Sequence, residues 1–247
     1  MLEWLRIADR GRSMKEVAVA SEVSTLRITL RLLMAFVVMS AAFFGSAGTV
    51  AWPQAWLYMI IQFSFWTVTA LWLKKHNPQL LKDRMVFLKP ATRGWDKTII
   101  MTSTAVFVPY LLLPGLDAVR YEWSSVPVLV SVFAYAGVMV SLLLFFAVLR
   151  ENAYLSRFVE VQKERGHKVI TTGPYRYVRH PMYVGLIFLL YSIPVDLGSL
   201  WTLVPASVLT LLFVIRTHFE DKTLHEELDG YKAYSGKVKY RLLPGLW

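Results

Sequence analysis

Long apolar blocks separated by basic segments dominate the chain. Asp, Glu, Lys and Arg are absent from residues 32–73, 98–116 and 123–149, and the stretch 181–215 contains only Asp196. A transmembrane helix needs about 20 mostly apolar residues. The pattern therefore predicts several membrane spans and an all-α, polytopic membrane helix bundle.

Glycine and proline divide two of these blocks, because both residues favour turns. Gly45, Gly48 and Pro53 split the first block into spans at about 28–50 and 54–73, and the next two blocks supply one span each. Residues 194–198 interrupt the last block, which predicts a tight hairpin of helices at about 181–195 and 199–219. The bundle then has about six helices, and length alone does not decide whether the short first arm of the hairpin spans fully.

The basic residues between the spans predict the orientation. All 27 Lys and Arg except Arg120 fall in segments 1–31, 74–97, 150–180 and 216–247, which the positive-inside rule places in the cytoplasm together with both termini. We therefore expect one integral membrane domain over 1–247. It comprises a cytoplasmic or interfacial segment 1–27, four transmembrane helices within 28–149, and a polar loop, helical hairpin and cytoplasmic tail in 150–247.

Composition and charge favour membrane lipid over nucleic acid as a partner. The chain is 55% hydrophobic with a net charge of +10. Its basic residues flank the spans, where they contact anionic lipid headgroups, so we expect membrane lipid as a partner and no nucleic acid. The absence of cysteine excludes disulfides, thiolate metal ligands and a cysteine nucleophile. Residues 1–24 mix arginines with apolar residues, which indicates an interfacial helix and not a cleaved signal peptide.

A dense polar segment lies directly before the last apolar block. Residues 172–185 read TGPYRYVRHPMYVG, at a membrane edge where unpaired polar groups are penalised. Pro181 suits the first turn of a helix and pushes His180 out of helical geometry. The free N–H groups of such a helix start suit a carboxylate or another electron-rich ligand group. The tyrosines at 175, 177 and 183 can pack against a flat or cationic ligand group. Taken singly, Arg176 and Tyr177 are more typical of interfacial anchoring.

A second polar segment follows the last span. Arg216 and Glu220 are four residues apart and share one helix face, which on its own predicts an ordinary surface ion pair. The His, Asp and Glu residues around them fit a solvated helix, so no metal site is expected. No glycine-rich fingerprint follows a strand pattern, which excludes the soluble dinucleotide-fold mode of cofactor binding.

The two segments together resemble the superfamily of isoprenylcysteine carboxyl methyltransferases and phospholipid methyltransferases. Its Gly-x-Tyr element and Arg-His-Pro-x-Tyr-x-Gly run match residues 173–185, and its arginine with paired acids matches Arg216, Glu220 and Asp221, where aspartate replaces the commoner second glutamate. The resemblance covers about residues 125–247 and implies S-adenosyl-L-methionine as cofactor. The cofactor contacts that it implies are Gln162, His167, Lys168, Val169, Ile170, Tyr175, His180, Pro181, Met182, Tyr183 and Glu220.

These features predict methyl transfer from S-adenosylmethionine to a lipophilic acceptor. The resemblance implies that Arg216 holds the acceptor's negative group, and a planar guanidinium can bind a carboxylate through two hydrogen bonds. A carboxylate is already ionised near neutral pH, so positioning is the main catalytic effect. We favour carboxyl O-methylation of an isoprenylcysteine-like substrate at the cytoplasmic side, with no obligate protein partner.

Three alternatives remain at this point. Phospholipid N-methylation of the phosphatidylethanolamine type would need an ammonium deprotonated, for which His180, Glu220 or Tyr183 are candidates. An NADPH-dependent membrane sterol or enone reductase is a second alternative, because residues 240–247 (YRLLPGLW) resemble the tail of that group. A non-catalytic membrane scaffold is the third, and it would bind neither cofactor.

Overall fold

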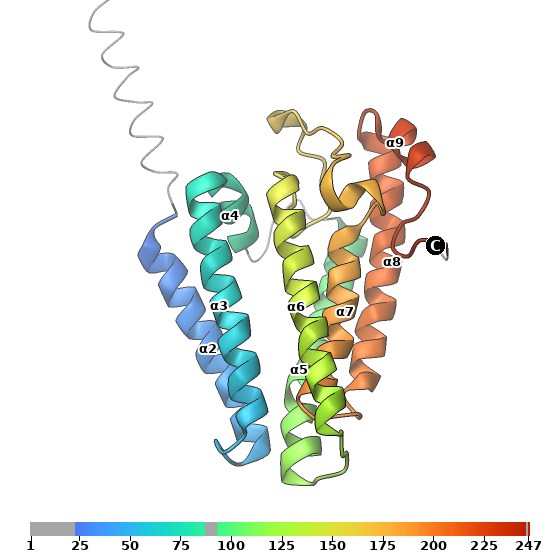
Figure 1. Cartoon of the computed structure of the whole chain (residues 1–247). Coiled ribbons are helices and arrows are strands. Elements are labelled where there is room, and N and C mark those ends of the chain that lie inside the picture. Colours follow the sequence, from blue (N-terminus) through green and yellow to red (C-terminus); the bar gives the residue numbers. More distant parts are fainter. Residues whose placement is uncertain (1–22, 87–92, 246) are drawn as a thin grey trace, which may run out of the picture.

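The computed structural model describes residues 23–86, 93–245 and 247, and within them all regular structure is helical (Figure 1). The helices are α2 (Thr25–Ala47), α3 (Pro53–His76), α4 (Pro78–Met85), α5 (Gly94–Gly115), α6 (Val128–Glu151), α7 (Pro181–Asp196), α8 (Leu203–Glu227) and α9 (Tyr231–Lys237). A π-helical turn, η1 (Leu116–Arg120), continues α5, and two short 3₁₀ turns, η2 (Lys163–Arg165) and η3 (Gly173–Arg176), lie between α6 and α7. The predicted all-α membrane bundle is confirmed.

Five of the described helices are long and apolar enough to cross a membrane: α2, α3, α5 with η1, α6 and α8. Helix α7 has 16 residues, which corresponds to about 24 Å at a rise of about 1.5 Å per residue and is shorter than the roughly 30 Å hydrocarbon core. It packs between α6 and α8. The short first arm of the hairpin therefore exists as expected and is supported by its neighbours.

Local chemistry sets the helix ends where they differ from the expected ones. The Ser24 hydroxyl accepts the Arg27 N–H at 3.2 Å, so α2 begins at Thr25, and Gly48 ends it in the left-handed region at φ 75°. Helix α8, the second arm of the hairpin, starts later and ends later than the expected 199–219. Its start is delayed by a turn that contains Gly198 at φ 85°, and it continues past the apolar block through the second polar segment.

The basic segments gather at one end of the bundle. The end of α3 with α4, the end of α6, the loop before α7 and the end of α8 with α9 all lie there (Figure 1). Arg120 lies at the opposite end, where its Nη2 atom donates to the Gly45 carbonyl at 3.3 Å. This arrangement is the one that the positive-inside pattern predicts for a bundle with an even number of crossings. The expected interfacial helix at residues 1–24 falls almost wholly outside the described residues.

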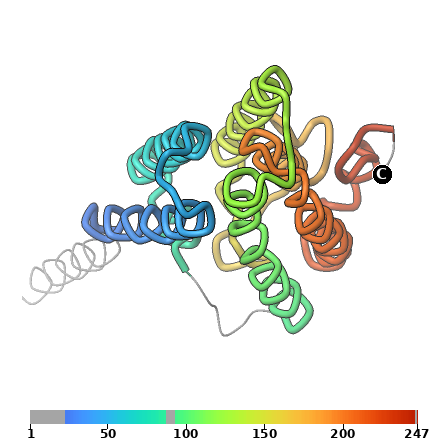
Figure 2. The backbone as a smooth tube through the Cα atoms, turned by 90° about the horizontal axis from the view of Figure 1, so that it is seen from below, coloured from blue at the N-terminus to red at the C-terminus, as the bar shows by residue number. Residues whose placement is uncertain are grey.

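Close helix crossings and a buried carboxylate fix the hairpin that carries the site. Figure 2 shows α2 and α3 side by side on one flank of the bundle. A Cβ added at Gly115 would lie 2.6 Å from backbone atoms of α2, so only glycine permits the crossing of α5 with α2. Asp117, which follows it, accepts hydrogen bonds from the Ser199 hydroxyl at 2.6 Å and the Trp201 N–H at 3.1 Å. These bonds tie the turn between α7 and α8 to η1.

Candidate active site

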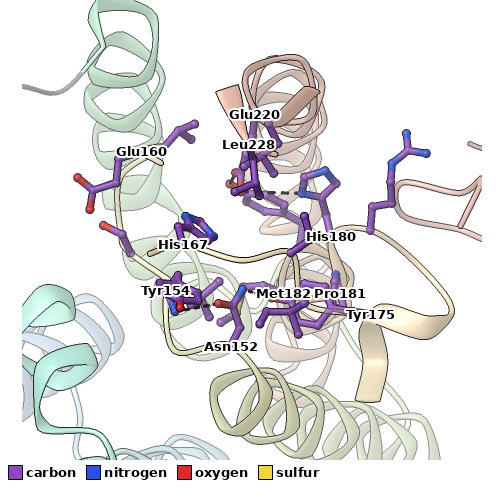
Figure 3. A pocket seen from close by; sticks show the side chains of 18 of the residues that line it. Asn152, Tyr154, Glu160, His167, Tyr175, His180, Pro181, Met182, Glu220 and Leu228 are labelled. Carbon is purple, nitrogen blue, oxygen red and sulfur yellow. Dashed lines mark hydrogen bonds and ion pairs between the residues drawn. The ribbon is translucent and has the colours of Figure 1, made fainter. Parts of the chain in front are cut away.

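A cavity of about 290 Å³ lies at the basic end of the bundle, where the loop after α6 meets the start of α7, the end of α8 and α9. Figure 3 shows the loop residues Tyr154, Glu160 and His167 on one side of it and His180, Glu220 and Leu228 on the other. Small-molecule sites commonly measure about 300–1,000 Å³. Both polar segments contribute to the cavity wall.

The first polar segment ends in the helix start that the sequence predicts. His180 has φ −126° and ψ 62°, outside helical geometry, and Pro181 is the first residue of α7. The Tyr183 and Val184 N–H groups donate to the His180 carbonyl at 3.1 and 3.4 Å. Pro181 has no N–H, so Met182 supplies the one N–H of this first turn that has no backbone hydrogen bond among the described residues. The start of α7 therefore offers fewer free donors than the sequence suggested.

The two polar segments meet. The Tyr183 hydroxyl donates to Glu220 Oε2 at 2.6 Å, and His180 Nδ1 lies 3.9 Å from Glu220 Oε1. On its other side, His180 Nε2 lies 3.1 Å from Asp221 Oδ1. Because Glu220 and Asp221 are adjacent on α8, they contact opposite nitrogens of one imidazole. The hairpin of α7 and α8 thus brings together residues about forty positions apart in the chain.

Asp221 is the hub of a buried network behind the cavity. Its side chain is 1% exposed and accepts from Arg179 Nε at 2.8 Å and Nη2 at 3.0 Å, from Arg241 Nε at 2.9 Å and from the Tyr231 hydroxyl at 2.8 Å. Hydrogen bonds between charged groups are the stronger kind, and a carboxylate has acceptor sites for all of them. Asp221 does not line the cavity. Its role is to hold Arg179 and His180 in place.

The tail after α9 binds the backbone of the first polar segment. The N–H groups of Arg179 and His180 donate to the carbonyls of Tyr240 and Arg241, both at 3.0 Å. The Tyr234 hydroxyl donates to the Tyr175 carbonyl at 2.7 Å. Burial raises the pKa of Tyr234, and of Tyr175, above the ordinary phenol value, so both hydroxyls stay protonated at neutral pH.

Arg216 pairs with a residue that sequence reasoning missed. Its Nε atom donates to Asp96 Oδ1 at 2.7 Å and its Nη2 atom to the Arg157 carbonyl at 2.8 Å. Among the described residues it forms no ion pair with Glu220, so the surface pair suggested by their spacing is wrong. The Nε side of the guanidinium is therefore occupied by the protein. The Nη1 atom, at its far edge, has no hydrogen bond within the described part of the chain.

A second cavity of about 310 Å³ adjoins the first. It lies between α5, α7 and α8 and shares four lining residues with the first cavity. The shared residues are Arg157, Leu186, Phe213 and Arg216, and the remaining lining is mostly aliphatic and aromatic. Arg216 therefore stands where a polar cavity at the basic end meets an apolar cavity between membrane-spanning helices.

The loop after α6 supplies the other side of the polar cavity. Residues 167–170 line it, and the His167 ring stacks on Tyr154 with ring centroids 4.3 Å apart. Burial, and secondarily the charge of Arg165, lowers the pKa of His167 below the ordinary value, so the neutral ring is favoured. Its Nδ1 atom accepts the Gln162 N–H at 3.3 Å.

Gln162 is the one expected cofactor contact that does not reach the cavity lining. Its side chain is buried, its amide nitrogen donates to the Tyr154 carbonyl at 3.1 Å, and its amide oxygen accepts from Arg165. Gln162 therefore holds the loop from behind. Tyr177, one of the three tyrosines expected at the ligand, is 72% exposed and also lies outside the lining, as interfacial anchoring would require.

Residues 128–229 match the model of the phospholipid methyltransferase family. That family belongs to the superfamily of integral membrane methyltransferases. The matched segment runs from the start of α6 to just past α8 and contains both polar segments, so the resemblance carried by the motifs is confirmed. No curated protein matches the chain. The family favours methyl transfer over the reductase and scaffold alternatives.

Several residues of the site lie outside the matched segment. Asp96, in the first turn of α5, lines neither cavity but binds Arg216. Tyr231 and Tyr234, in α9, line the first cavity. Asn152, inside the segment, donates to the Tyr175 hydroxyl at 2.8 Å. One signal for Asp96 was present in the sequence, because it is an acid placed two residues before an apolar block.

Proposed function

We propose that this membrane methyltransferase transfers a methyl group from S-adenosylmethionine to the carboxylate of a lipophilic, isoprenylcysteine-like acceptor. The observation that carries the proposal is the meeting of the two cavities at Arg216. A polar cavity beside an apolar one is what a water-soluble cofactor and a membrane-soluble acceptor need if they are to react. A guanidinium at the junction suits an acceptor whose reacting group is an anion.

The chemistry of the polar cavity fits the cofactor. S-adenosylmethionine carries an adenine ring, a carboxylate, an ammonium and a sulfonium, and it supplies an electrophilic methyl group. Tyr175 and His180 offer ring faces, Glu220 offers a carboxylate to a cationic group, and Lys168 with the Met182 N–H offers donors to a carboxylate. We propose that these residues, together with His167, Val169, Ile170, Pro181 and Tyr183, hold the cofactor.

In methyl transfer the protein has to position the acceptor carboxylate and to exclude water. An acceptor carboxylate is already ionised near neutral pH, so no side chain has to remove a proton. The far edge of Arg216 can orient one carboxylate oxygen for in-line attack on the methyl carbon. As the new O–CH₃ bond forms, the S–CH₃ bond breaks, and an anion and a sulfonium become a neutral ester and a neutral thioether. Leu186 and Phe213, which line both cavities, exclude water from the reacting groups.

A phospholipid amine is the second candidate acceptor, because the matched family model is that of phospholipid methyltransferases. That reaction needs a base for the ammonium. His180 Nε2 and the Tyr183 hydroxyl are both engaged by carboxylates, which leaves His180 Nδ1, 3.9 Å from Glu220, as the available nitrogen. Methylation of an amine would therefore require a base from this site, whereas methylation of a carboxylate would not.

Purified protein in detergent, incubated with methyl-labelled S-adenosylmethionine, tests the proposal. With N-acetyl-S-farnesylcysteine as acceptor, we expect label in a base-labile ester. With phosphatidylethanolamine, we expect no labelled product. Arg216→Ala should lower kcat/KM for the farnesylcysteine by at least about a hundredfold, the cost of losing a charged hydrogen-bond partner in a buried site.

Arg120→Ala is the matched control, because Arg120 lies at the other end of the bundle and should leave turnover unchanged. Full turnover by Arg216→Ala with bound cofactor would refute the acceptor contact. If label appeared only in phosphatidylethanolamine, the acceptor would be a phospholipid amine and not a carboxylate.

The same proposal places the site and both termini on the cytoplasmic side, within a single membrane domain that needs no obligate protein or nucleic-acid partner. The gathering of basic segments at the site's end of the bundle supports this orientation. Cysteine residues introduced at positions 120 and 237, at opposite ends, should label from opposite sides of sealed vesicles.

A further inference from the structure

Asp96 is buried without any exposed surface and uses both carboxylate oxygens. Oδ1 accepts from Arg216 Nε at 2.7 Å, and Oδ2 accepts the Val159 N–H at 3.0 Å. The Arg157 carbonyl, two residues from Val159, accepts from Arg216 Nη2. One carboxylate on α5 thus fixes α8 and the loop after α6 together, and two hydrogen bonds hold the Arg216 guanidinium.

Arg216 has a second carboxylate within reach. Glu220 is four residues further along α8, and side chains at this spacing lie about 5–6 Å apart at Cβ. The two side chains flank Tyr183, whose ring centroid lies 5.9 Å from Arg216 Cζ and whose hydroxyl donates to Glu220. In the structure each of the two charged groups has its own partner. Arg216 is bound to Asp96, and Glu220 is bound to Tyr183.

We propose that Asp96 is a positioning residue that holds Arg216 away from Glu220. The far edge of the guanidinium then faces the acceptor's carboxylate, and Glu220 stays available to the cofactor. A buried guanidinium without a counter-ion is costly, so loss of Asp96 would turn Arg216 onto the nearest remaining carboxylate of its own helix face. This proposal rests on the function proposed above, and it adds a residue from outside the matched family segment.

Equilibrium binding tests this without turnover. The probes are N-acetyl-S-farnesylcysteine and its methyl ester, measured without cofactor, and S-adenosylhomocysteine, measured by calorimetry. In wild-type protein the acid should bind more tightly than the ester. In Asp96→Asn this preference should fall at least about tenfold, and S-adenosylhomocysteine affinity should fall as well, because Arg216 captures Glu220. Asp96→Glu, which keeps the charge, should retain most of the preference.

The double variant separates positioning from simple structural damage. In Asp96→Asn/Glu220→Gln neither of these two carboxylates remains to capture Arg216, so the acid preference should return. Asp96→Asn should then cause no further loss of S-adenosylhomocysteine affinity beyond that of Glu220→Gln alone. Asp117→Asn is the matched control. It is an equally buried aspartate that bonds a turn at the far end of the bundle. It should lower thermal stability and leave both affinities unchanged.

A wild-type acid preference in Asp96→Asn, or an equal loss in the single and double variants, overturns the inference. Failure of the proposed function looks different. In that case wild-type protein binds no S-adenosylhomocysteine, or does not distinguish acid from ester. If only the acid preference is missing, non-additive loss of S-adenosylhomocysteine affinity still supports the separation of Arg216 from Glu220, and additive loss refutes it.

Discussion

The Asp221 hub makes a quantitative prediction about stability. Asp221→Asn keeps the size of the side chain but removes the charge that two arginines and a histidine share, and it points amide hydrogens at donors. Removing one partner of a buried ion pair costs about 3–5 kcal/mol. The Arg179 pair is of this kind, with side chains 7% and 1% exposed, whereas Arg241 is 27% exposed and adds little. We therefore expect a loss of about 3–5 kcal/mol.

For a chain of this size, each kcal/mol corresponds to roughly 2–4 °C in Tm. Asp221→Asn should thus lower the Tm in detergent by about 6–20 °C, as followed by intrinsic fluorescence on heating. The control is Asp229→Asn, which changes an exposed acid in the same region. Stabilisation by added S-adenosylhomocysteine should also fall, because Arg179 and His180 lose their support. A Tm within about 2 °C of wild type would refute the view of Asp221 as the hub.

The other predictions concern a hydrogen bond, a helix crossing and a titrating ring. Tyr183→Phe removes the donor to Glu220, so S-adenosylhomocysteine affinity measured by calorimetry should fall about tenfold, as expected for a bond to a charged group. Gly115→Ala should destabilise the protein by about 1–3 kcal/mol through overpacking, whereas Gly45→Ala should not, because a Cβ added at Gly45 meets no atom within 4 Å. The lowered pKa of His167 means that the unfolded chain takes up a proton first as pH falls through about 6.5, so this ring's contribution to stability is full above that pH and is lost below it. The Tm should therefore fall more steeply from pH 7 to pH 5 in wild type than in His167→Gln, and parallel curves would refute this.

Hydropathy and turn residues were sufficient to predict the six apolar helices and the hairpin, but not the short polar helices α4 and α9. Uncharged blocks define spans because the membrane excludes charge, and the turn at 194–198 predicts that the two polar segments return to one end. The contact of Tyr183 with Glu220 follows from that topology. The partner of Arg216 could not be predicted from the sequence. Asp96 is 120 residues away in sequence, and no hydropathy pattern specifies which faces of α5 and α8 meet. The same holds for Gln162, because a loop residue can face a ligand or its own backbone with equal ease.

The contacts of the tail have a consequence for the order of folding. The backbone of Arg179 and His180 is bonded to residues 240 and 241, about sixty positions later in the chain. During synthesis the first polar segment therefore emerges before its partners at residues 238–241. Competence to bind the cofactor should thus appear only after synthesis of the tail, and chains that end before residue 238 should be unable to bind cofactor.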